Sequence, residues 1–143
     1  MAMKKFINNA ADLTPELVEG YVKANAARVK MVGDRIIVRA DAKEAGKVGV
    51  ITMGGSGHEP ALSGWVGKGL LDVTVLGDIF AAPGAPKIIK AIKLADTGTG
   101  VVMVTFNHEG DVLSSNMALQ MAERQGLKVH RILVSDDISS APR

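Results

Sequence analysis

Apolar residues along this chain fall into short β-branched runs that alternate with segments of helical spacing. The runs predict strands at 35–39, 48–52, 73–76, 101–106 and 129–134. Apolar positions three and four residues apart predict helices that begin at Thr14, Pro86 and Asp111. Such alternation is typical of a parallel sheet with helices packed against it. We therefore expect an α/β fold, a three-layer α/β/α arrangement with a mostly parallel central sheet.

Capping chemistry sets the expected helix ends. Thr14 can cap the first helix, and Pro15 suits a first helical turn because that turn needs no N–H from it. Val29 is expected on the apolar face of this helix. The helix that Asp111 opens is expected to end at Gly126. Its buried side is predicted to comprise Leu113, Met117, Leu119, Met121 and Ala122.

Composition narrows the class of protein. The chain has 143 residues, of which 47% are hydrophobic and 22% charged, as expected for one globular domain with a real core. A net charge of +2 without a basic run argues against nucleic-acid binding. The absence of cysteine excludes disulfides and thiolate metal sites. No apolar stretch is long enough to span a membrane, and we expect a cytoplasmic protein. Residues 1–9 are predicted to be an arm, with Phe6 and Ile7 packing on the domain or on a partner, and residues 139–143 have linker composition.

A glycine-rich stretch follows the strand at 48–52. Gly54, Gly55, Ser56 and Gly57 are expected to form a turn whose backbone N–H groups face a ligand, with His58 presented beside them. The stretch lacks the Gly-Lys-Ser/Thr ending of a P-loop, and it does not match the dinucleotide motif. A purely structural turn, with His58 capping the next helix, is the alternative.

A second segment that joins a strand to a helix follows the strand at 101–106. Asn107 to Asp111 join it to the next helix, and ligands in open α/β sheets bind beyond the carboxyl ends of strands. We expect His58 and Asp111 to share one pocket there. Asp111 could instead be a simple N-cap, or serve both roles.

The other polar residues near these strand ends are not expected to be catalytic. Asp78 could line the site but is expected to be an ordinary loop carboxylate, and Glu59 is expected to orient the glycine loop or bind a helix end. His108 and His130 are expected to face solvent or to be structural. No histidine and carboxylate cluster has metal-ligand spacing, so no metal site is predicted.

Several motifs occur together and in order across nearly the whole chain. They are Gly54-Gly-Ser-Gly-His-Glu-Pro60, Lys4-Lys-Phe-Ile-Asn-Asn9, Val38-Arg-Ala-Asp41, Gly46-Lys-Val-Gly49, Gly64-Trp-Val-Gly-Lys-Gly-Leu-Leu-Asp72 and Asn107-His-Glu-Gly-Asp-Val112. Together they resemble the dihydroxyacetone kinase family, in its ketose-binding K subunit. The resemblance implies that residues 1–143 are the N-terminal domain of such a subunit, whose second domain is absent here.

The resemblance also implies a function. It makes the chain part of a ketose kinase, with His58 and Asp111 catalytic and with Gly54, Gly55, Ser56, Gly57, His58 and Asp111 binding the ketose. ATP or ADP with magnesium, or a phosphotransferase-system donor, would be held on another subunit or domain. The implied partners are the remainder of the subunit, the nucleotide-binding subunit and a second copy in a homodimer. The fragment alone should be inactive.

Two departures from the family pattern concern substrate identity. Met53 stands where the family usually has a glycine, and Phe106 stands where it usually has a lysine that helps to hold substrate. A further family histidine, which bonds covalently to the ketone carbon, would lie beyond Arg143. The alternative function is therefore a non-catalytic ketose-binding sensor or coactivator.

Overall fold

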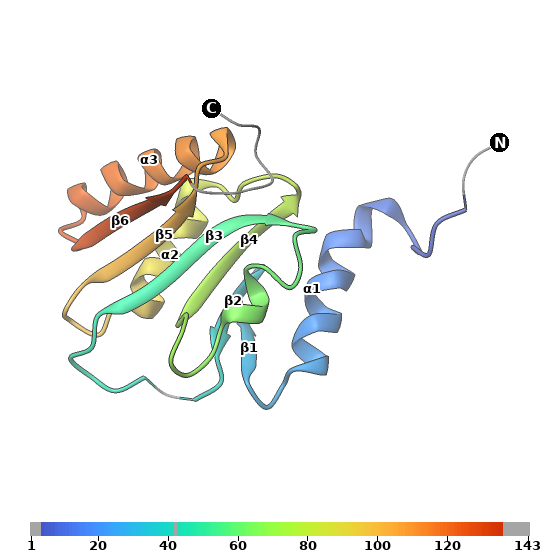
Figure 1. Cartoon of the computed structure of the whole chain (residues 1–143), viewed down its shortest axis with the longest axis horizontal. Coiled ribbons are helices and arrows are strands. Elements are labelled where there is room, and N and C mark those ends of the chain that lie inside the picture. The colour runs from blue at the N-terminus through green and yellow to red at the C-terminus, as the bar shows by residue number, and fades with distance from the viewer. Residues whose placement is uncertain (1–3, 42, 136–143) are drawn as a thin grey trace.

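The computed structural model describes residues 4–41 and 43–135. Its centre is a six-stranded sheet in the order β1-β2-β4-β3-β5-β6 (Figure 1). The strands are β1 (Val29–Val32), β2 (Ile36–Arg39), β3 (Gly49–Ser56), β4 (Val73–Ile79), β5 (Val101–Phe106) and β6 (Val129–Val134). The pairs β4-β3, β3-β5 and β5-β6 are parallel, whereas β1 and β2 add antiparallel strands at one edge. The predicted α/β fold with a mostly parallel sheet is confirmed.

Helices lie on both faces of the sheet. The helical segments are η1 (Ala10–Asp12), α1 (Leu13–Ala24), η2 (Ser63–Trp65), α2 (Ala85–Ala95) and α3 (Glu109–Arg124). On one face, α2 and α3 close a core that includes Ile88, Ile92 and Met103. On the other face, Val18 of α1 and Leu62 beside η2 pack against Ile37 and Leu76. Burying these apolar side chains supplies most of the stabilisation, at about 1.5–3 kcal/mol for each large residue.

The second face is covered unevenly. In the described part of the chain, α1 and η2 pack over β1, β2 and β4, whereas Val102 and Val104 of β5 stay half-buried and Ile132 of β6 is 46% exposed. A strand that is apolar at successive positions is typically buried on both faces, but β5 is fully buried only on the face toward α2 and α3. The most central parallel strand is β3, which lies between β4 and β5.

Some element predictions are wrong in detail. Val29 belongs to β1 and not to the first helix, because α1 already ends at Ala24. Gly33, at a positive φ of 65°, then makes the turn from β1 into β2. Thr14 is buried inside α1, and Asp12 occupies the capping position. Leu113 and Met117 of α3 are 61% and 53% exposed, although their spacing predicts burial.

The glycine stretch extends a strand and does not begin with a turn. Gly54, Gly55 and Ser56 continue β3, and the chain turns at Gly57, with a φ of 98°. A Cβ on Gly55 would lie 2.6 Å from the backbone nitrogen of Ala81, and one on Gly77 would lie 1.9 Å from the carbonyl oxygen of Ala81. These glycines therefore allow the ends of β3 and β4 to approach the segment after β4.

Residues 4–9, which precede η1, add little to the core. Phe6 is fully exposed, so the prediction that it packs on the domain is wrong. The linker predicted at residues 139–143 lies outside the described residues. Within residues 4–41 and 43–135, no helix is both long and apolar enough to cross a membrane.

Candidate functional site

A cavity of about 230 Å³ opens at the carboxyl ends of β3 and β5. Because the two strands are parallel neighbours, the segments that follow them meet at this edge of the sheet. Gly54 and Gly55 come from the end of β3, and His108 and Asp111 follow β5. The cavity is lined by Gly54, Gly55, His58, Ala61, Leu62, Trp65, Phe106, His108 and Asp111.

A second cavity of about 320 Å³ adjoins the first. Both are lined by Gly55, His58, His108 and Asp111, so these residues lie at their junction. The remaining lining of the second cavity is Phe80, Ala82 and Gly110. The structure therefore places His58 and Asp111 in one common pocket, as their positions after β3 and β5 predict.

Asp111 is the most deeply placed polar group of this pocket. Its side chain belongs to the first turn of α3 and the residue is only 6% exposed. Burial raises the pKa of the Asp111 carboxyl, while His108 and, to a smaller extent, His58 oppose that rise. The N-cap position belongs to His108, so the N-cap interpretation of Asp111 is wrong. A buried carboxylate that lines a cavity is suited to accept a proton or a hydrogen bond from a hydroxyl.

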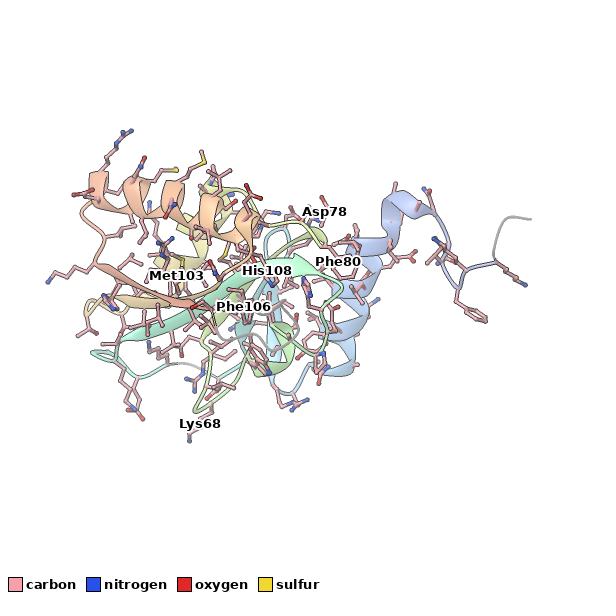
Figure 2. The ribbon with its side chains drawn as sticks, turned by 45° about the horizontal axis from the view of Figure 1, so that its top comes forward. Lys68, Asp78, Phe80, Met103, Phe106 and His108 are labelled. Carbon is pink, nitrogen blue, oxygen red and sulfur yellow. The ribbon has the colours of Figure 1, made fainter. Side chains whose placement is uncertain are left out.

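His58 lies at the exposed rim of the pocket, just after the turn at Gly57. Its ring makes an edge-to-face contact with Phe80, with centroids 5.1 Å apart, and stacks on His108 at 6.1 Å. Figure 2 shows Phe80 and His108 from the segments after β4 and β5 near one edge of the sheet. Glu59 Oε2 accepts a hydrogen bond of 2.9 Å from the Gly57 N–H, which confirms that Glu59 orients the loop.

The predicted substrate-binding residues separate into two groups. Gly54, Gly55, His58 and Asp111 line the cavities, whereas Ser56 and Gly57 line neither. Ser56 is fully buried, and its hydroxyl donates a hydrogen bond of 2.8 Å to the Gly77 carbonyl oxygen. The structure thus gives Ser56 a structural contact between β3 and β4.

Part of the pocket wall does not follow from the sequence pattern. His108 is exposed, as predicted, but it also lines both cavities, which was not predicted. Phe106 stacks at a tilt on Trp65 and on His108, with centroids 6.2 and 6.3 Å apart. The sequence offered one signal for this. In an extended chain, side chains two residues apart point to the same face, so the side chain of residue 108 lies on the same face as that of residue 106.

Other charged groups near the pocket are engaged elsewhere. Asp78 pairs with Arg35, which confirms its interpretation as an ordinary carboxylate. Among the described residues, the lining of both cavities includes neither lysine nor arginine. Across residues 4–41 and 43–135, no group of three or more histidine, aspartate or glutamate side chains could hold a metal ion.

Comparison with known proteins explains the arrangement. The Dak1 domain family matches residues 19–143. The chain belongs to the Dak1 family. It is 45% identical over 138 residues to the PTS-dependent dihydroxyacetone kinase 1, dihydroxyacetone-binding subunit DhaK of Listeria innocua, covering 96% of this chain and 42% of that protein. The chain therefore spans less than half the length of this Dak1 relative.

Solved Dak1 relatives have the same fold. The dihydroxyacetone kinase from C. freundii in complex with AMP-PNP and Mg2+ superposes with a TM-score of 0.88 at 36% identity, over 96% of this chain and 26% of that one. A dihydroxyacetone kinase operon co-activator, Dha-DhaQ, matches with a TM-score of 0.80 at 34% identity, over 87% of this chain and 38% of that one. A kinase and a co-activator thus share this fold, so the fold alone does not decide between the two functions.

Proposed function

We propose that this chain is the ketose-binding part of a dihydroxyacetone-type kinase. The observation that carries the proposal is Asp111, a carboxylate only 6% exposed that lines a cavity of about 230 Å³ together with His58. Burying a carboxylate without a bonded partner is costly, and sites of this kind cluster where chemistry occurs. The names of the relatives, dihydroxyacetone kinases and their dihydroxyacetone-binding subunits, support the choice of a small ketose.

The chemistry is phosphoryl transfer to a primary hydroxyl. Asp111 accepts the hydroxyl proton as the ketose oxygen forms a bond to phosphorus, and the bond between phosphorus and the donor's leaving oxygen breaks. The raised pKa of Asp111 makes the carboxylate a better base than an exposed aspartate. His58, at the rim, is placed to hold another oxygen of the ketose.

The phosphoryl donor belongs to a partner in this proposal. The pocket lining has no lysine or arginine among the described residues, and those residues contain no metal cluster, so a triphosphate and its magnesium are not expected here. ATP or ADP with magnesium, or a phosphotransferase-system donor, would instead be presented by another subunit or domain. The complex of the C. freundii kinase with AMP-PNP and Mg2+ supports a nucleotide as donor. The homodimer, the cytoplasmic location and the inactivity of the isolated chain stay predictions.

The experiment uses the complete ketose-binding subunit assembled with its donor subunit. Dihydroxyacetone phosphorylation is measured for the unsubstituted protein and for Asp111→Asn, which keeps the shape of the side chain but cannot accept the proton. We expect a loss of at least about a hundredfold in kcat, the lower end of what a general base contributes. Turnover close to that of the unsubstituted assembly would remove Asp111 from the mechanism.

The second candidate is a co-activator that binds a ketose without phosphorylating it. Phe106 favours it, because an aromatic ring at this wall can pack on a ketose but cannot donate a hydrogen bond to it. The similarity to the DhaQ co-activator supports it as well. Ketose binding without any phosphorylation, in an assembly supplied with donor, would favour this function over the kinase.

A further inference from the structure

Several features of His108 are not explained by a purely structural role at the rim of the pocket. It occupies the N-cap position of α3, yet its side chain makes no capping hydrogen bond. The side chain is exposed, so burial does not explain its placement. It lines both cavities, together with the His58 and Asp111 side chains. The His108 side chain therefore borders the space where a ligand would meet the Asp111 carboxylate.

The rings around His108 fix its orientation. On one side it stacks on His58, with planes inclined by 18° and centroids 6.1 Å apart. It also contacts Phe106 at a tilt of 55°, with centroids 6.3 Å apart. Figure 2 shows Phe106 and His108 side by side at the end of β5. An imidazole that already contacts two rings loses less rotational freedom when it binds a ligand, which favours affinity.

A bound ketose also needs more than one hydrogen-bond donor from the pocket. Ketoses carry a carbonyl oxygen and several hydroxyls, and Asp111 can only accept hydrogen bonds when ionised. Phe106 and Leu62 offer no donor, and Trp65 offers only its indole N–H. Among the described lining residues, His58 and His108 are the side chains with a donor nitrogen that line both cavities beside Asp111, whereas Trp65 lines only the first.

We propose that His108 is a second ketose-binding imidazole, which hydrogen-bonds an oxygen of the substrate beside Asp111. The inference rests on the proposed function, because it names a further contact in the same pocket. His108 acts in binding and not in proton transfer. Its loss therefore raises KM for the ketose and leaves kcat nearly unchanged.

Two substitutions separate hydrogen bonding from ring packing. His108→Phe keeps an aromatic ring beside His58 and Phe106 but removes both nitrogens. His108→Gln removes the ring but keeps a side-chain donor and acceptor. His130→Phe is the matched control, because His130 lies on β6, is exposed, and lines neither cavity.

The assay is dihydroxyacetone phosphorylation by the complete ketose-binding subunit with its donor subunit. We expect KM to rise about five- to tenfold for His108→Phe, as for loss of one neutral hydrogen bond, with kcat within about twofold. His108→Gln should lie between this variant and the unsubstituted protein, and His130→Phe should match the latter. Imidazole ¹⁵N resonances of His108 should shift when dihydroxyacetone is added.

Three outcomes would overturn the inference. An unchanged KM for His108→Phe would show that the ring alone matters, and so would a larger loss in His108→Gln than in His108→Phe. A fall in kcat without a change in KM would give His108 a different role. If the unsubstituted assembly does not phosphorylate dihydroxyacetone, the proposed function fails first; if it does and only the His108 result is negative, this inference fails alone.

Discussion

Gly54 and Asp111 face each other across the floor of the pocket. A Cβ at residue 54 would lie 3.7 Å from Asp111 Oδ2 and 2.8 Å from Leu62 Cδ1. The missing side chain therefore leaves open space above the carboxylate and room for the loop that carries Leu62. The same space lets the Asp111 oxygens line a cavity, although the residue as a whole is buried.

The buried carboxylate should weaken the fold at neutral pH. Burial raises the pKa of Asp111, so the folded chain holds this proton more tightly than the unfolded chain. The resulting stability is fully present below the unfolded pKa and is lost as pH rises through the folded pKa. We expect Asp111→Asn to gain free energy of unfolding relative to the unsubstituted chain between pH 4 and pH 7, measured by urea titration. A difference independent of pH would contradict the assigned burial.

The contribution of Asp72 to stability should depend on pH in the opposite direction. Burial alone would raise its pKa, but the Val50 N–H at 2.9 Å, with Lys43 and Arg39 at 3.0 and 3.1 Å, holds the pKa of this carboxyl below its usual range. Its stabilisation is therefore present above the unfolded pKa and is lost as pH falls through the folded pKa. Asp72→Asn should cost about 3 kcal/mol at pH 7, because it leaves the Lys43 ammonium buried without its partner.

A surface pair provides the comparison for Asp72. Glu44 pairs with Lys47, and both side chains are mostly exposed. Exposed ion pairs of this kind contribute little to stability, so Glu44→Gln should leave the urea midpoint unchanged. Equal losses in Asp72→Asn and Glu44→Gln would show that the Asp72 cluster has no special stabilising role.

Glycines in this chain should respond to substitution according to their surroundings. A methyl group on Gly77 would lie 1.9 Å from the Ala81 carbonyl oxygen, so Gly77→Ala should destabilise by about 3 kcal/mol or more. Gly20 lies inside α1 with nothing within 4 Å of its Cβ position, so Gly20→Ala should stabilise by about 0.5–1 kcal/mol. Thermal unfolding of the two variants checks both signs, and a shift in the same direction would refute the packing described for Gly77.

Phe106 should limit affinity for the ketose. A lysine there would place an ammonium donor in the cavity that Asp111 lines, and hydrogen bonds to charged groups contribute about 1.5–3 kcal/mol. We expect Phe106→Lys to lower the dissociation constant for dihydroxyacetone about tenfold by calorimetric titration, whereas Phe106→Leu should not. Weaker binding by the lysine variant would show that the aromatic wall itself selects the ligand.

The elements of this fold follow largely from local pattern. The strands at 101–106 and 129–134 match β5 and β6 residue for residue, because apolar β-branched runs bounded by glycine or polar residues leave few alternatives. The helix at Pro86 begins one residue earlier, at Ala85. Leu113 and Met117 could not be placed in this way, since helical spacing identifies a face but not whether a neighbouring element covers it.

The site could be predicted less completely. His58 and Asp111 follow strand ends, so topology alone places them near one edge of the sheet once β3 and β5 are neighbours. The roles of Gly54, Gly55 and Ser56 depend on long-range packing. Gly55 lies against Ala81, and the Ser56 hydroxyl on β3 donates a hydrogen bond to the Gly77 carbonyl oxygen on β4. His108 was missed for the same reason, because its ring is oriented by His58, fifty positions earlier in the chain.

A crystal structure of the complete subunit with dihydroxyacetone would show whether the ketose binds beside Asp111. We predict the ketose in the cavity bounded by Gly54, His58 and Asp111, with a primary hydroxyl oxygen about 2.6–3.2 Å from an Asp111 carboxylate oxygen, within reach for proton transfer. A ketose bound in another part of the molecule, or one whose hydroxyls all point away from Asp111, would contradict this prediction.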